Sequence, residues 1–358
     1  MDLHALPSPL VAAPLPAPVS RPRRQTESPR LSVVVVNYQH WDDTTKLLRQ
    51  LRSSQSLKRG EAEVVVVDNH SPPHPVVGKL RRLAGVSLRR WRHNRGFARA
   101  VNEGCRLSRG DWLLLLNPDV TCDPGFLDGV LRHADRLAVE QPDVGVVGFR
   151  LRNPDGTRQL STGRFPTLAS TLAGLLLPRA RRKYQAVSET EGSRVDWATG
   201  CCLLVRRKCW EQLRGLDTAF FLYYEDVDLC ARAAVLGWKV QYEPGLAVTH
   251  HNPLHTRGVP APLRLITRHA LLTYAHKYWP PSHQRILARI VGCEAWVRQF
   301  RARRRGDVAA AQVFGELRKL AADFAGGDSA RAGRRLLRVL RRQEEKPRAA
   351  VVGRHSEP

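Results

Sequence analysis

The sequence lacks the cysteine patterns that indicate a zinc site or a disulfide framework. Its seven cysteines include no C-x-x-C pair, and an odd number fits a set of paired disulfides poorly. A reducing compartment is therefore the simpler expectation. The seven are Cys105, Cys122, Cys201, Cys202, Cys209, Cys230 and Cys293.

Signals for export or membrane insertion are also missing. The first residues, MDLHALPSPLVAAPLPAPVSRPRR, have no basic start followed by an apolar core, as a signal peptide has. The longest apolar run, 167–177, falls well short of the roughly 20 residues of a membrane-spanning helix. We therefore predict a cytoplasmic protein.

Acidic residues are scarce relative to basic ones. Lys and Arg number 58 against 33 Asp and Glu, which gives a formal net charge of +25. Such an excess favours anionic partners, although a preference for Arg on solvated surfaces explains it equally well. No helix-turn-helix, zinc-finger or RNA-recognition signature is present. We therefore do not expect a nucleic-acid-binding protein.

The pattern of the chain predicts four regions. Residues 1–30 form a Pro- and Arg-rich leader that we expect to be disordered. An α/β domain spans 31–262, a helical basic extension spans 263–345, and a flexible tail spans 346–358. The basic extension either docks on an anionic membrane, as Arg-rich helices do, or forms a solvated helical pair.

Buried strands and helices alternate through the first half of the α/β domain. Continuous apolar or β-branched runs at 31–38, 63–71, 86–91 and 111–119 alternate with helical patterns, one of them at 98–107. This alternation predicts a parallel, doubly wound sheet. Ligands of such sheets bind at the carboxyl ends of the strands, where the sequence places Asn37, Asp68 and Asp119.

Several of these positions suit a site for a phosphorylated ligand and a cation. Asp119 after a buried strand fits Mg²⁺ or Mn²⁺, and Asn-Pro-Asp is also a good turn. Asp68 fits a hydrogen bond to a base or ribose, or a local cap. Gly96 at a helix start places backbone N–H groups where phosphate is favoured, although glycine is common there.

An acidic cluster lies among aromatic residues in FFLYYEDVDLC. Charged groups in such surroundings are costly to desolvate, and adjacent carboxylates such as Glu225 and Asp226 raise one another's pKa, which suits a general base. The same residues also fit an acidic first helical turn, and both interpretations can hold. Farther on, VTHH ends a strand with His250, a candidate metal ligand.

Together the ordered motifs resemble the family 2 glycosyltransferases, within them the rhamnosyltransferase-like branch. The resemblance runs from Ser32 to His251. The matching blocks, in order, are VVVVNYQ, VVVVDNHS, NRGFARAVNEG, LLLLNPDV, NPDG, VDWATGCCLLVRR, LDTAFFLYYEDVDLCAR, GWKVQYEP and VTHH.

The resemblance implies a GT-A fold, Rossmann-like, and a role for each matching residue. Asp226 would be the catalytic base, with Glu225 beside it contacting the acceptor. Asp119 would hold the divalent metal, Mg²⁺ or Mn²⁺, with His250 as a further ligand. The remaining assignments are a donor-binding set and an acceptor-side set: Asn37, Asp68, Asn94, Gly96, Phe97, Asn102 and Asn117 for the nucleotide and donor, and Trp197 and Gly200 for the acceptor.

The implied function is inverting sugar transfer onto an acceptor hydroxyl in cell-surface glycan or glycolipid synthesis. The branch favours dTDP-rhamnose as donor and leaves UDP-sugars open, with a glycan or lipid-linked acceptor. A catalytically inactive sugar-nucleotide-binding protein is the main alternative. A processive polysaccharide synthase is not expected, because membrane spans and the Q-x-x-R-W block are missing.

Overall fold

The computed structural model describes residues 28–174, 184, 192–253 and 258–344. The predicted tail, 346–358, and all but the last three residues of the predicted leader lie outside these residues. Contacts divide the chain into two compact units, Met1–Gly258 and Val259–Pro358. The sequence had placed this boundary at residue 262.

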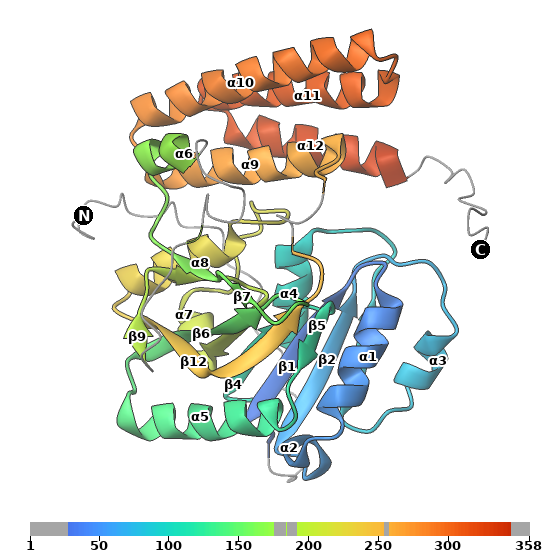
Figure 1. Cartoon of the computed structure of the whole chain (residues 1–358), viewed down its shortest axis with the longest axis vertical. Coiled ribbons are helices and arrows are strands. Elements are labelled where there is room, and N and C mark those ends of the chain that lie inside the picture. Colours follow the sequence, from blue (N-terminus) through green and yellow to red (C-terminus); the bar gives the residue numbers. More distant parts are fainter. Residues whose placement is uncertain (1–27, 175–183, 185–191, 254–257, 345–358) are drawn as a thin grey trace. The chain divides into compact units, whose positions relative to one another are not determined.

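The first unit is an α/β domain built on one large sheet (Figure 1). Eight strands follow the order β3-β2-β1-β4-β11-β6-β12-β5, with β7 and β9 attached to β6 and β12, and β8 and β10 form a separate pair. The strands are β1 Leu31–Asn37, β2 Ala62–Asp68, β3 Val86–Arg90, β4 Trp112–Leu116, β5 Val120–Cys122, β6 Val144–Arg152, β7 Arg158–Gln159, β8 Thr162–Gly163, β9 Ser193–Arg194, β10 Trp197–Ala198, β11 Cys202–Arg206 and β12 Lys239–His250.

Helices connect these strands. α4 packs closely on β1. At Gly104 the helix lies so near that a Cβ atom would clash with the Val34 side chain. The helices of this unit are α1 Trp41–Leu51, α2 Gln55–Lys58, α3 Val76–Leu80, α4 Phe97–Leu107, α5 Phe126–Glu140, α6 Leu168–Gly174, α7 Arg207–Gln212 and α8 Glu225–Val235.

The sheet is parallel in its first half and mixed in its second. β1 pairs in parallel with β2 and β4, as the sequence pattern predicts. The parallel arrangement predicted from the first half of the domain does not extend to β11, which runs antiparallel to both β4 and β6. β11 begins beside the carboxyl end of β4, where Cys202 pairs with Leu116. A strand that starts at that edge runs back antiparallel and needs no crossover helix.

The strand register brings the functional residues to one edge. Asn37 is the pairing partner of Asp68. β6 and β12 run parallel to each other, with β12 extending to His250. The carboxyl ends of β1, β2, β4, β6 and β12 therefore face the same edge, together with the start of β11.

The second unit is a group of four helices: α9 Ala261–Tyr278, α10 Pro281–Arg304, α11 Val308–Ala325 and α12 Ser329–Glu344. α10 and α11 lie side by side along their length (Figure 1). Among the described residues, no helix combines the length and apolar character needed to span a membrane.

A half-buried carboxylate connects two of these helices. Glu294 of α10 forms ion pairs with Arg264 and Arg268 of α9 and with Arg298 one turn along. Burial by itself raises the pKa of Glu294, but the hydrogen bonds and charges of Arg268 and Arg298 outweigh it and lower the pKa to about 2. The carboxylate is thus paired with arginines of both helices.

Candidate active site

Asn37 organises the loop after β1. Its side-chain amide donates to Asp68 Oδ1 at 2.9 Å and to Ser71 Oγ at 3.0 Å. Its Oδ1 accepts from the backbone N–H of His40 at 3.2 Å and from Thr44 Oγ1 at 3.0 Å. Both donors and both acceptor positions of the amide are therefore used. Asn37 therefore holds this loop in place, and its predicted role in nucleoside binding stays a prediction.

Asp68 is fully buried and paired. Its second oxygen accepts from Arg90 Nε at 2.8 Å, and the Arg90 guanidinium lies 5.6 Å from the centre of the Trp41 ring. Sequence reasoning missed Arg90. The signal was available, because Asp68 and Arg90 end neighbouring parallel strands and are register partners.

The NRGF segment, residues 94–97, is hydrogen-bonded both to the loop after β2 and to the segment before α8. Asn94 Oδ1 accepts from Asn69 Nδ2 at 2.8 Å and from the Gly96 N–H at 2.9 Å. Gly96 has φ +91°, and a Cβ there would lie 2.9 Å from the Phe221 carbonyl oxygen. The first N–H of α4, from Phe97, donates to the same carbonyl at 2.7 Å. That N–H is thus used to tie α4 to the segment before α8.

Asn102 makes a second connection between α4 and that segment. Its Nδ2 donates to the Leu216 carbonyl and its Oδ1 accepts from the Leu216 N–H, both at 2.9 Å. The side-chain amide of Asn102 therefore pairs with both backbone groups of Leu216. Together with the Phe97 contact, this joins the predicted donor side of the domain to the chain that carries the predicted base.

Asp119 and His250 form the candidate metal pair. β5 pairs with the end of β12, with Val120 opposite His250, and the His251 N–H donates to the Asp119 carbonyl at 2.9 Å. This pairing sets Asp119 Oδ2 3.4 Å from His250 Nε2, with both side chains largely buried. One carboxylate oxygen and one imidazole nitrogen so placed suit a divalent cation that takes its other ligands from phosphate and water.

The two side chains perturb each other's protonation. Burial by itself raises the pKa of Asp119, but the hydrogen bond and charge of His250 bring it below its ordinary value. Burial lowers the pKa of His250, but Cys201 and Asp119 outweigh it and raise the pKa to about 10. No group of three or more His, Cys, Asp or Glu side chains suited to a metal occurs in the described part of the chain. A cation here would rest on two protein ligands.

Gln159 orients His250, and sequence reasoning missed it. Its amide lies 3.0 Å from His250 Nδ1, and its buried Oε1 has no hydrogen-bond partner. Because amide and ring assignments are interchangeable, the reversed amide would accept from Nδ1–H, and Nε2 could then bind a metal in exchange for its proton. The NPDG turn was the available signal, since it folds Gln159 back beside Leu151 of β6.

Asp226 lies in the first turn of α8, as one of its two predicted interpretations requires; its role as general base stays a prediction. Its Oδ1 accepts from the Val227 N–H at 2.9 Å, and its Oδ2 accepts from the Gly200 N–H at 3.1 Å. Glu225, the first residue of α8, is also buried. The preceding residues, Tyr223 and Tyr224, have φ of 73° and 67°. Such left-handed geometry in bulky residues is costly and concentrates at functional sites.

The chain around Gly200 connects the two halves of the site. The Asn117 N–H donates to the Cys201 carbonyl at 2.9 Å. Gly200, the neighbour of Cys201, donates to Asp226. Contiguous contacts thus run from the residues around Asp119 to Asp226 along one edge of the sheet.

Trp197 occupies an interior position near this edge. Its ring is fully buried, its Nε1 donates to the Arg164 carbonyl at 2.9 Å, and its ring centre lies 5.4 Å from that of Tyr184. Burial and the charge of Asp226 raise the pKa of Tyr184. Trp197 is therefore a packing residue in this structure, and its predicted acceptor-side role stays a prediction.

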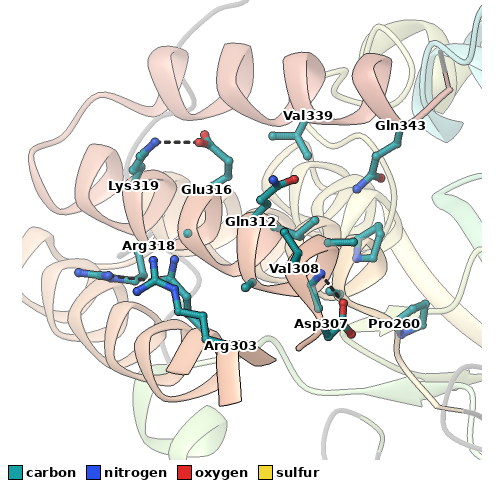
Figure 2. A pocket seen from close by; sticks show the side chains of 18 of the residues that line it. Pro260, Arg303, Asp307, Val308, Gln312, Glu316, Arg318, Lys319, Val339 and Gln343 are labelled. Carbon is teal, nitrogen blue, oxygen red and sulfur yellow. Dashed lines mark hydrogen bonds and ion pairs between the residues drawn. The ribbon is translucent and has the colours of Figure 1, made fainter. Parts of the chain in front are cut away.

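A separate groove of about 1350 Å³ lies within the second unit. Figure 2 shows side chains from α10, α11 and α12 around it, including Arg303, Gln312 and Val339. It contains none of the residues that the sequence predicts for catalysis or donor binding.

Comparison with known proteins identifies the chain. The family described as glycosyltransferase like family 2 matches residues 29–268, a span that holds every predicted site residue. The chain is a family 2 glycosyltransferase. The predicted family and enzyme class are thereby confirmed.

Named relatives place the glycosyltransferase near rhamnosyltransferases. It is 32% identical over 249 residues to the N-acetylglucosaminyl-diphospho-decaprenol L-rhamnosyltransferase of Mycobacterium tuberculosis, covering 64% of this chain and 79% of the relative. It is 25% identical over 231 residues to the rhamnosyltransferase WbbL of Escherichia coli (strain K12), covering 61% and 82%. The predicted rhamnosyltransferase-like branch is thus confirmed.

A solved structure supports the GT-A architecture of the glycosyltransferase. The crystal structure of GalNAc-T7 with UDP, GalNAc and Mn²⁺ superposes with a TM-score of 0.54 at 13% identity, covering 75% of this chain and 51% of that one. At this identity the likeness shows the fold alone. The individual roles of the site residues stay predictions.

Proposed function

We propose that this glycosyltransferase moves a sugar from a nucleoside diphosphate to an acceptor hydroxyl with inversion at the anomeric carbon. Asp226 acts as general base, and Asp119 and His250 hold a divalent cation against the diphosphate. The observation that carries this proposal is the contact path from Asn117 through Cys201 and Gly200 to Asp226. This path supports the proposal because it runs along one edge of the sheet, between the residues next to Asp119 and Asp226.

The reaction is a single displacement. Asp226 takes the proton from the acceptor hydroxyl as that oxygen attacks the anomeric carbon, and the bond from this carbon to the diphosphate oxygen breaks. General-base catalysis of this kind contributes ~10²–10⁴-fold in rate. The Gly200 and Val227 N–H groups fix the carboxylate in one orientation. Glu225, adjacent in the chain, would contact the acceptor.

The donor set Asp119 and His250 fits a hard divalent cation such as Mg²⁺ or Mn²⁺, which needs few protein ligands when phosphate supplies the rest. When bound, the cation neutralises charge on the departing diphosphate. Asn37, Asp68 and Asn94 hold the loops around the nucleoside, and Asn117 lies at the first position of the NPD segment. Trp197 and Gly200 support the acceptor side.

Rhamnose is the sugar we propose for transfer, because relatives named as rhamnosyltransferases align over most of their length. The donor is then a nucleoside-diphosphate rhamnose such as dTDP-rhamnose, with UDP-sugars as competitors to be tested. The name of the mycobacterial relative includes a diphospho-decaprenol acceptor. We accordingly propose a lipid-linked acceptor in cell-surface glycan synthesis.

The test combines a donor screen with one substitution. Sugar nucleotides are compared by thermal shift with Mn²⁺ present, since a true donor raises apparent stability by mass action. Asp226→Asn is expected to lower kcat by ~10²–10⁴-fold while the donor Kd is unchanged. Asp228→Asn is the matched control, because Asp228 lies two residues along α8, is buried and is paired with Arg232, so its loss should affect stability.

Near-normal turnover by Asp226→Asn would refute the assignment of the base. A protein that binds donors but shows no transfer or donor hydrolysis with either metal would instead be an inactive sugar-nucleotide-binding member of the fold.

A further inference from the structure

α10 carries two apolar faces on opposite sides. Its buried side packs inside the bundle through residues that include Leu287, Val291 and Ala295. A second set recurs every three or four residues on the opposite side and is exposed, with Trp296 at 56% and Phe300 at 49%. The exposed set is Ile286, Ile290, Trp296, Val297 and Phe300, with the exposed Cys293 in the same row. We call these residues the outer face of α10.

One apolar stripe is enough to anchor a helix in a bundle. α11 lies along the buried side of α10 (Figure 1), so the outer face is not needed for folding of this unit. An exposed row of large apolar side chains costs solubility unless it has a partner. Its chemistry therefore indicates what that partner is.

The margins of the outer face are basic. α10 contains six arginines and a single acidic residue, Glu294, and Glu294 is engaged with Arg264 and Arg268 of α9. Arg285, Arg289 and Arg301 are exposed beside the apolar row. The outer face thus combines apolar side chains with positive charge on both sides.

Its aromatic residues are arranged for an interface between water and lipid. The Trp296 and Phe300 rings stack, with centres 6.3 Å apart and planes 16° apart, and the Arg304 guanidinium lies 4.9 Å from the Phe300 ring centre. Tryptophan and arginine both place an apolar body in lipid and a polar end in water. Helices that lie in the bilayer surface have this composition.

We propose that the outer face of α10 binds the surface of an anionic phospholipid bilayer. The apolar row enters the boundary between headgroups and acyl chains, and the flanking arginines contact lipid phosphates. A second copy of the chain is the weaker partner, because two such faces would bring arginine rows together without acidic partners. The proposal does not depend on the identity of the donor or of the catalytic base.

The experiment measures co-sedimentation of the full chain with phosphatidylcholine vesicles with and without phosphatidylglycerol. Trp296→Ala/Phe300→Ala is expected to lower the partition coefficient on anionic vesicles by about tenfold or more. Arg289→Gln/Arg301→Gln should lower it by about fivefold per charge. The matched controls lie on α12, where Arg334→Gln/Arg338→Gln removes equal charge and Leu337→Ala removes an exposed apolar side chain.

The expected pattern is strong loss with the α10 variants and small loss with the α12 variants. Circular dichroism and the thermal shift with UDP should match the wild type, which separates this outcome from misfolding. Equal binding by wild type and Trp296→Ala/Phe300→Ala, or equal loss from the α12 charge variant, would overturn the assignment to α10. Equal binding of the wild type to vesicles with and without phosphatidylglycerol would also overturn the proposal. A wild-type dimer that Trp296→Ala/Phe300→Ala dissociates, with no vesicle binding by either protein, would make the outer face a self-association surface instead.

Discussion

Asp119 Oδ2 and His250 Nε2 lie 3.4 Å apart although the two residues are far apart in the sequence. The antiparallel pairing of β5 with the end of β12 accounts for the approach, because it sets Val120 opposite His250. The two side chains are thereby presented together by sheet hydrogen bonds, which are more rigid than a loop.

Gln159 should control the metal affinity of the site through His250. Gln159→Leu removes the group beside His250 Nδ1 and is expected to weaken Mn²⁺ binding by ~10–100-fold, as loss of a metal-supporting partner does. Gln159→Glu keeps an acceptor for Nδ1–H and should retain the affinity. Electron paramagnetic resonance of free Mn²⁺ in the presence of nucleoside diphosphate measures both. Equal affinities of the two variants would show that Gln159 does not orient the ring.

The left-handed backbone at Tyr224 should be strained, and glycine at this position should relieve the strain. Tyr224→Gly and Tyr224→Ala remove the same side-chain contacts beyond Cβ, but only glycine adopts φ near 67° without a steric penalty. We expect the glycine variant to have a free energy of unfolding about 1 kcal/mol above that of the alanine variant. Urea denaturation of both variants gives the comparison. An alanine variant that is the more stable of the two would contradict strain at this position.

Asn102 should act through the backbone of Leu216. Asn102→Ala removes two hydrogen bonds and is expected to lower the free energy of unfolding by about 1–3 kcal/mol. Because the contact ties α4 to the segment before α8, kcat should fall as well. Kinetics and denaturation on the same preparations check both. A variant with weakened donor binding but unchanged stability would instead support direct contact between Asn102 and the donor.

His269 should make stability depend on pH. Burial lowers the pKa of this fully enclosed imidazole from 6.5 to about 4, so the unfolded chain binds a proton that the folded chain does not between these values. Stability is therefore expected to fall by about 3 kcal/mol as pH drops from 6.5 to 4, and to stay level above 6.5. His269→Leu should flatten this dependence in urea denaturation at pH 4.5 and pH 7. An unchanged pH slope in the variant would assign the effect to other groups.

Local patterns were sufficient for the positions of the main elements. The apolar runs predicted β1, β2 and β4, and polar residues closing these runs predicted Asn37, Asp68 and Asp119 at the carboxyl edge. The ordered motifs also identified the family. These features depend on residues that are neighbours in the chain, so they can be read from spacing alone.

The partners of those residues were decided by the tertiary structure. β11 runs antiparallel because of where its start lies, which no local period encodes. Arg90 neutralises Asp68, and Gln159 supports His250, because strand pairing brings distant residues into register. The Gly200 N–H holds Asp226 through backbone alone, so no side-chain pattern marks it. The sequence by itself determined which chemical groups the protein has at its strand ends, and the three-dimensional packing decided which of them meet, because long-range pairing depends on the whole sheet.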